Sequence, residues 1–288
     1  MLLSFLNRQD IPEVKEICDK LISLKKRILS GNVDNPNIEY ESIKDKFETI
    51  RAYALTCHDS TLADSQRVFK EYFHLFCNLA KFKQCLLNKN YRQSWDALQD
   101  CMSSAIFVGR FTPIVHRLDI PDIIELLEDY ERLYPYSFFF SSEFVIAKSH
   151  CSICGKSMQS PECLHRRGQL YCGEVAVEIV DEIKEFQAIC LVENPEDKKC
   201  VIESADGKSL SFDLLEEFLD MNFPWLQRFS ITKTIEHKIS PDIIMAGRNS
   251  PCTCGSGVKF KKCCGKNLYY DHLQCTIIPG DRVCLAML

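Results

Sequence analysis

Four cysteines stand close together near the carboxyl end of the chain. They follow the pattern C-x-C…C-C and are Cys252, Cys254, Cys263 and Cys264. Four thiolates so near one another in sequence suit one tetrahedral metal ion far better than they suit disulfides. Between the two pairs, Gly255 and Gly257 allow the chain to reverse tightly, so both pairs can face one point. We therefore predict a metal site here.

The residues around these cysteines read P-C-T-C-G-S-G-V-K-F-K-K-C-C-G and resemble the SEC-C motif. This motif is the zinc finger that ends the SecA preprotein-translocase ATPase, and it also occurs in many otherwise unrelated bacterial proteins. The resemblance implies that the four cysteines bind zinc, with Cys264 where SecA often has His. It covers only residues 248–266 of the 288. It therefore indicates metal binding and says little about biological role.

The same segment carries five basic residues and no acidic one. The five are Arg248, Lys259, Lys261, Lys262 and Lys266. Zinc bound by four thiolates has a formal charge of about −2, which five cations overcompensate. Because the whole chain has a net charge of −5, we expect the finger to be a locally positive knob. Such a surface suits an acidic protein partner or a phosphate backbone.

A simpler alternative is that the finger is only a folding staple, since structural zinc supplies folding free energy by itself. The resemblance to SecA favours a recognition role. In SecA the similar finger contacts the acidic export chaperone SecB, and related fingers associate with ribosomes. It therefore implies an acidic chaperone or a ribosome-type surface as the class of partner.

A second cysteine cluster lies in the middle of the chain. Residues 151–155 form a C-x-x-C-G turn, a sequence common in zinc knuckles. We predict a second zinc site of three thiolates and one imidazole, formed by Cys151, Cys154, Cys163 and His165. Cys172 and His150 are rival ligands, although Cys172 begins an alternating apolar stretch typical of a strand. No βαβ pattern surrounds the C-x-x-C pair, which disfavours a thioredoxin-type redox site.

Apolar spacing predicts a mainly α fold that begins with a helical bundle. Helical periodicity occupies a segment that opens at Asp10-Ile11-Pro12, then Tyr40–Cys57, Thr61–Asn88, Tyr91–Ala105 and Asp119–Leu133. Short connections between such helices favour antiparallel packing. We predict four regions, namely a helical domain (1–140), an α+β zinc-knuckle module (141–246), the SEC-C finger (247–267) and a tail (268–288).

Strand signals are confined to the second half of the chain. Strands are predicted at Leu170–Val180, Phe186–Val192 and Lys199–Glu203, with a hairpin turn at Asp206-Gly207 and a short helix over Phe212–Phe223. Residues 227–247 have the composition of a connector. The tail has a hairpin pattern with its turn at Pro279-Gly280-Asp281.

Composition narrows the class of protein. The 17 cysteines, the absence of a secretory leader and the absence of a long apolar run lead us to expect a reduced, cytoplasmic protein. The net charge of −5 disfavours nucleic-acid binding through the whole surface. Cysteines scattered singly along the helices are expected to pack as small buried side chains.

No catalytic motif emerges from the sequence. There is no H-E-x-x-H, and Gly255–Lys259 lacks the spacing of a phosphate-binding loop. Each cluster offers four ligands, so neither leaves the open position that catalytic zinc requires. We therefore lean against an enzyme and predict a two-zinc adaptor that acts by binding a protein.

Two other hypotheses stay open. The first is a nucleic-acid-associated protein, in a phage-defence or mobile-element setting, which uses both zinc modules. Its support is the basic residues beside the first cluster: Lys148, Lys156, Arg166 and Arg167. The second is an unrecognised metalloenzyme.

Overall fold

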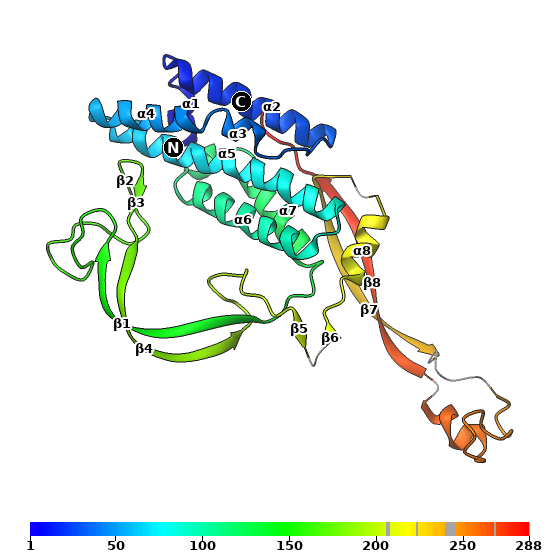
Figure 1. The fold of residues 1–288 in the computed structure, drawn as a ribbon. Helices are drawn as coiled ribbons and strands as arrows, with labels where there is room; N and C mark the ends of the chain where they lie inside the picture. Colours follow the sequence, from blue (N-terminus) through cyan, green and yellow to red (C-terminus); the bar gives the residue numbers. More distant parts are fainter. Residues whose placement is uncertain (206–207, 223, 240–245, 268, 288) are drawn as a thin grey trace. The chain divides into compact units, whose positions relative to one another are not determined.

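The structure is a computed structural model that describes residues 1–205, 208–222, 224–239, 246–267 and 269–287 (Figure 1). The chain divides into two compact units. The first comprises Met1–Arg228 with Asp281–Leu288, and the second comprises Phe229–Gly280. Among the described helices, none is both long enough and apolar enough to cross a membrane.

The first unit is built on a helical bundle, as its apolar spacing predicts. Its helices are α1 (Leu2–Leu6), α2 (Pro12–Ser30), α3 (Ile38–Glu41), α4 (Lys44–Thr56), α5 (Ser60–Leu87), α6 (Tyr91–Arg110) and α7 (Ile120–Glu131). Particular residues determine where α2 begins and ends and where α5 begins. Pro12 occupies the first turn of α2, and Gly31, with φ +84°, ends it in the left-handed conformation. The Asp59 carboxylate accepts the Leu62 N–H at the start of α5.

Helix α5 supplies most of the aromatic core of the bundle. Its fully buried rings include Phe69, Tyr72, Phe73, Phe76 and Phe82. Phe82 packs edge-on against Tyr130 of α7, with ring centroids 5.1 Å apart. The aromatic stripe of this helix is therefore core, as its helical spacing predicts.

A buried polar cluster joins the end of the chain to this bundle. The Lys25 ammonium donates to the Tyr72 hydroxyl (2.7 Å), the Asp119 carboxylate (3.2 Å) and the Ala286 carbonyl (2.6 Å). The Ala286 N–H in turn donates to Asp119 (3.0 Å). The side chains of Lys25 and Asp119 are both fully buried. Residues after β8 thus return to the first unit.

A long antiparallel ribbon follows the helices, formed by β1 (Phe139–Cys151) and β4 (Glu178–Val192). Between them, β2 (Leu170–Tyr171) pairs with β3 (Glu174–Val175). The strand expected at Phe186–Val192 lies within β4, which begins earlier, at Glu178. The single strand expected at Leu170–Val180 is wrong, because this segment is divided among β2, β3 and the start of β4, and the partner strand β1 was not expected. The strand expected at Lys199–Glu203 is only an isolated bridge between Val201 and Phe139.

The base of this ribbon is attached to α6 through Trp95. The indole N–H of Trp95 donates to the Lys198 carbonyl (2.7 Å), and its ring stacks on Phe139. Beyond the ribbon lie β5 (Ser204–Ala205), β6 (Lys208–Ser209) and α8 (Asp213–Asp220). Helix α8 confirms the short helix expected here, whereas the expected turn at 206–207 lies outside the described residues.

The second unit holds the finger on a further ribbon. Strand β7 (Gln227–Ile239) pairs with β8 (Tyr269–Arg282). The short helices η2 (Phe260–Lys262) and η3 (Cys264–Asn267) lie between them in sequence. Two expectations are corrected here: residues 227–239 form a strand rather than a connector, and Pro279-Gly280-Asp281 lies within β8 rather than in a turn.

Candidate metal centres

The backbone of the finger folds around its first cysteine pair. The Cys252 N–H donates to the Val258 carbonyl (2.8 Å), and the Phe260 N–H donates to the Ser250 carbonyl (2.9 Å). Gly255 and Gly257 have φ of +81° and +71°, values that glycine adopts without strain. These two glycines therefore produce the tight reversal that the sequence predicts.

The reversal brings the four finger thiols together. Their sulfur atoms, from Cys252, Cys254, Cys263 and Cys264, all lie within 4.8 Å of one another. The Cys254–Cys263 distance is 3.5 Å and the Cys263–Cys264 distance is 4.0 Å. Tetrahedral zinc with sulfur at about 2.3 Å requires sulfur–sulfur separations of about 3.8 Å, whereas a disulfide requires about 2.05 Å. The cluster thus has the spacing of a metal site.

Local hydrogen bonds affect the finger thiols unequally. The hydroxyl and the N–H of Ser256 lower the pKa of the Cys254 thiol to about 6. Interactions with Cys252 and Cys254 raise the pKa of the Cys264 thiol to about 12. Ionised neighbours of this kind oppose ionisation of the Cys264 thiol, because like charges repel. A divalent cation at their centre would favour ionisation of all four.

Two further finger residues support the ligands, and cysteine spacing alone did not identify them. The Ser256 hydroxyl lies 3.2 Å from the Cys263 sulfur. Gly265 packs against buried Phe260 so closely that a Cβ at Gly265 would lie 2.7 Å from the Phe260 carbonyl oxygen. The C-C-G sequence was the available signal for this close approach.

The knuckle is a turn at the end of β1. The Gly155 N–H donates to the Cys151 carbonyl (2.9 Å), and the Cys151 N–H donates to the Lys156 carbonyl (2.7 Å). Gly155 has φ +70°, which explains why glycine follows the second cysteine. The Ser152 N–H donates to the Val177 carbonyl (2.9 Å), next to the start of β4.

The knuckle also gathers four potential ligands. One ligand atom from each of Cys151, Cys154, Cys163 and His165 lies within 4.8 Å of the other three. The Cys154 and Cys163 sulfurs are 3.7 Å apart. Nδ1 of His165 is buried and has no hydrogen-bond partner among the described residues. An imidazole that offers one nitrogen to three thiols and whose Nδ1 is otherwise unpartnered among the described residues fits a metal ligand.

The two rival ligands lie outside this group of four. Nδ1 of His150 is 2.8 Å from the Asp181 carboxylate. Cys172 is exposed, in the turn between β2 and β3, with φ +50°. The strand position expected for Cys172 is therefore a turn position. Which side chains bind an ion in solution stays a prediction.

The five basic residues of the finger are all exposed: Arg248, Lys259, Lys261, Lys262 and Lys266. Among the described residues, none of the five forms an ion pair within the chain. Among the four basic residues beside the knuckle, Lys156 is the one that forms an ion pair with a described residue, since its ammonium lies 3.1 Å from the Glu162 carboxylate. The finger therefore presents five cations that no described carboxylate neutralises through an ion pair.

Comparison with known proteins identifies the finger segment. The family model of the SEC-C motif matches residues 248–266. Protein translocase subunit SecA of Thermodesulfovibrio yellowstonii is 81% identical over 21 residues, which are 7% of this chain and 2% of SecA. SecA of Geobacter sulfurreducens is 77% identical over 22 residues, 8% of this chain and 2% of SecA.

A longer match is found with SecA of Pelobacter propionicus, which is 33% identical over 98 residues, 34% of this chain and 9% of SecA. The chain thus spans between 2% and 9% of the length of these curated relatives. No solved structure matches it. The predicted resemblance is confirmed: the chain carries a SEC-C motif similar to the one in SecA, and no named family accounts for the rest.

Proposed function

We propose that this SEC-C-motif chain is a non-catalytic, zinc-binding adaptor whose basic finger docks onto the acidic surface of a protein partner. Cys252, Cys254, Cys263 and Cys264 hold one zinc ion, and Cys151, Cys154, Cys163 and His165 hold the second. Four protein ligands at each ion leave no position for a water nucleophile, so both sites are structural. Zinc would fix the finger fold and keep its lysines on the outside.

In this adaptor the domains have separate roles. In this proposal the helical domain (1–140) and the zinc-knuckle module (141–246) form the body, and the finger (247–267) is the docking element followed by the tail (268–288). The relatives carry the same motif on a subunit of a protein translocase, which supports a protein as partner. An acidic chaperone or a ribosome-type surface is the class of partner with complementary charge.

The observation that carries the proposal is the charge of the finger. It has five exposed cations, contains no carboxylate within residues 248–266 and has no internal ion pair among the described residues. After subtraction of the zinc–thiolate charge, about +3 remains on a surface of 19 residues. A compact positive surface on an acidic chain accelerates and orients association with an acidic partner.

The test is affinity capture from a nuclease-treated lysate at low salt, analysed by quantitative mass spectrometry. The variant K259E/K261E/K262E reverses three finger charges. The matched control, K15E/K26E/K81E, reverses three exposed lysines of α2 and α5 that form no ion pair with described residues. We expect a group of acidic proteins to be retained by the wild type and the control, lost from the finger variant, and released by added salt.

Two outcomes would contradict this function. Identical captured proteins for the wild type and the finger variant would remove the docking role and leave the finger as a folding staple. Capture that disappears on nuclease treatment would favour the nucleic-acid-associated alternative, whose affinity should fall steeply with salt.

A further inference from the structure

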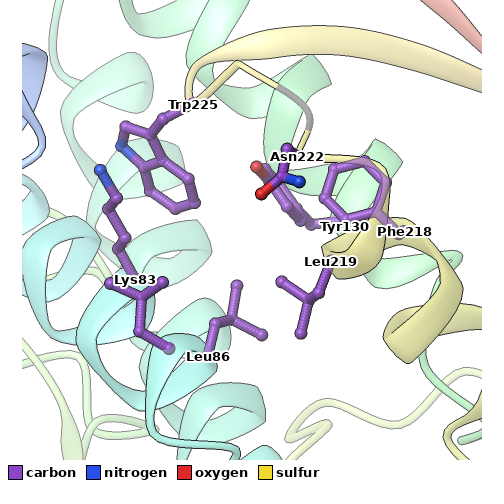
Figure 2. Close-up of a pocket in the computed structure, with 8 residues that line it drawn as sticks. Lys83, Leu86, Tyr130, Phe218, Leu219, Asn222 and Trp225 are labelled. Carbon is purple, nitrogen blue, oxygen red and sulfur yellow. The ribbon is translucent and has the colours of Figure 1, made fainter.

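A separate cavity lies in the first unit, away from both cysteine clusters in sequence. Its volume is about 240 Å³, and it opens between the end of α5, the end of α7 and helix α8 (Figure 2). The described residues that line it are Lys83, Leu86, Leu87, Tyr130, Phe218, Leu219, Asn222 and Trp225. The cavity is smaller than most cofactor pockets, which occupy roughly 300–1,000 Å³. It therefore suits a small molecule.

The walls of the cavity are apolar, and one end is positive. Leucine side chains and aromatic rings form most of the lining, and none of the eight residues is acidic. The Lys83 ammonium lies 5.1 Å from the centre of the Trp225 indole ring, within cation–π range. Figure 2 shows the indole nitrogen on the edge of the ring nearest to this ammonium.

Both polar groups at this end are hydrogen-bond donors without an acceptor in the part of the chain that the structure describes. Nε1 of Trp225 is buried without a partner among the described residues, and a buried unpaired donor is unfavourable. The Lys83 ammonium likewise makes no hydrogen bond or ion pair with a described residue, and burial lowers the pKa of Lys83. An anionic group placed here would accept from the indole and pair with the ammonium.

We propose that this cavity binds a small carboxylate with an apolar body, its carboxyl group at Lys83 and Trp225 and its chain among Leu86, Leu87 and Leu219. The apolar lining supplies burial for the body, and the two donors supply orientation. A cavity of about 240 Å³ has room for a short apolar body rather than for a large cofactor. The proposal is independent of the finger and its partner.

Octanoate, octanol and octylamine test this with the full chain, because they differ only in the head group. Calorimetry measures the affinity of each compound. The NMR resonance of the Trp225 indole N–H, one of two tryptophan indoles, shows whether the compound binds in this cavity. We expect saturable binding of octanoate, with a shift of that resonance and little binding of octylamine.

Substitutions of Lys83 and Leu219 test whether the carboxylate of octanoate binds in this cavity. K83M should weaken octanoate binding about tenfold or more, the effect of losing one charge-assisted hydrogen bond. K81M, which changes an exposed lysine of the same helix, should leave it unchanged. L219W should fill the cavity and abolish binding while helical content is retained.

A second role for Lys83 is distinguishable. A Cβ at Gly31 would lie 3.3 Å from the Lys83 ammonium, so this cation also lies close to the carboxyl end of α2, where it would favour the helix dipole. If K83M only lowers stability and leaves octanoate affinity unchanged, Lys83 supports α2 and the proposal is wrong. Equal binding of octanoate and octanol, or no saturable binding, would also overturn it.

Discussion

At the scale of single residues, Gly265 shows how little space the finger leaves around its four cysteines. It directly follows the cysteine pair 263–264, and a Cβ there would meet the carbonyl oxygen of Phe260 at 2.7 Å and its ring at 2.9 Å. Both are well inside normal contact. Backbone rather than a flexible side chain is in the way, so the chain around the cysteines would have to shift. Metal geometry depends on such supporting contacts.

We predict that Gly265→Ala weakens zinc binding by the finger roughly tenfold or more, in the range usual for changes outside the ligand shell. Competition with a chromogenic chelator measures it. Gly247→Ala is the matched control, because its Cβ would come close only to the Ser250 side chain, whose hydroxyl can rotate away. Equal zinc affinity for both variants would show that the finger does not have this packing.

The buried contacts of Lys25 allow a second prediction, which concerns the free energy of unfolding. Removal of the ammonium leaves the Asp119 carboxylate buried without its cation, and it also frees the Ala286 carbonyl. We expect Lys25→Met to lower the free energy of unfolding by about 3–5 kcal/mol. Lys26→Met, at an exposed neighbouring position, should change it little. Urea unfolding of the two variants compares them, and a small loss for Lys25→Met would contradict the buried pair.

At the scale of elements, the turn between β2 and β3 connects the knuckle to helices α4 and α5 by direct contacts. The Gly173 N–H donates to the Asp64 carboxylate at the start of α5 (2.7 Å). Arg51 of α4 forms an ion pair with Glu174. A Cβ at Gly173 would lie 3.0 Å from the Ala63 carbonyl, so the turn is in close contact with the helix. These contacts fix one end of the β1–β4 ribbon, and Trp95 fixes the other.

We predict that Asp64→Ala increases amide hydrogen exchange across residues 171–175 by about tenfold or more, because a hydrogen bond to a charged acceptor is lost. Asp45→Ala, at an exposed site of α4, is the control. Hydrogen exchange with mass spectrometry resolves this segment. Unchanged protection in Asp64→Ala would mean that the turn is not held by this contact.

At the scale of the whole molecule, the sequence predicted what depends on short-range patterns. Helical spacing located α5 and α6, and the cysteine spacing together with glycines located both clusters. The long ribbons were missed for a physical reason. In β1 and β4 many large apolar side chains, Phe144 and Ile183 among them, stay exposed, so no buried face imposes strict alternation. Register shifts near Val145 and Ile146 break the remaining period.

The tail (268–288) also has features that local sequence patterns do not predict. Pro279 and Gly280 read as a turn, but β8 contains both. Each strand of a two-stranded ribbon has one edge without a partner, where a proline that lacks its N–H is tolerated. The return of Ala286 to Lys25 spans 261 positions, and no local pattern encodes a contact of that range.

The most direct measurement is the metal content of the purified full chain, by elemental analysis together with native mass spectrometry. The account predicts two zinc ions in the wild type, and one each in C252S/C254S and in C151S/C154S. It also predicts loss of finger structure when a strong chelator removes the ions. A wild-type protein that is free of metal, or whose clustered cysteines are paired as disulfides, would contradict the account.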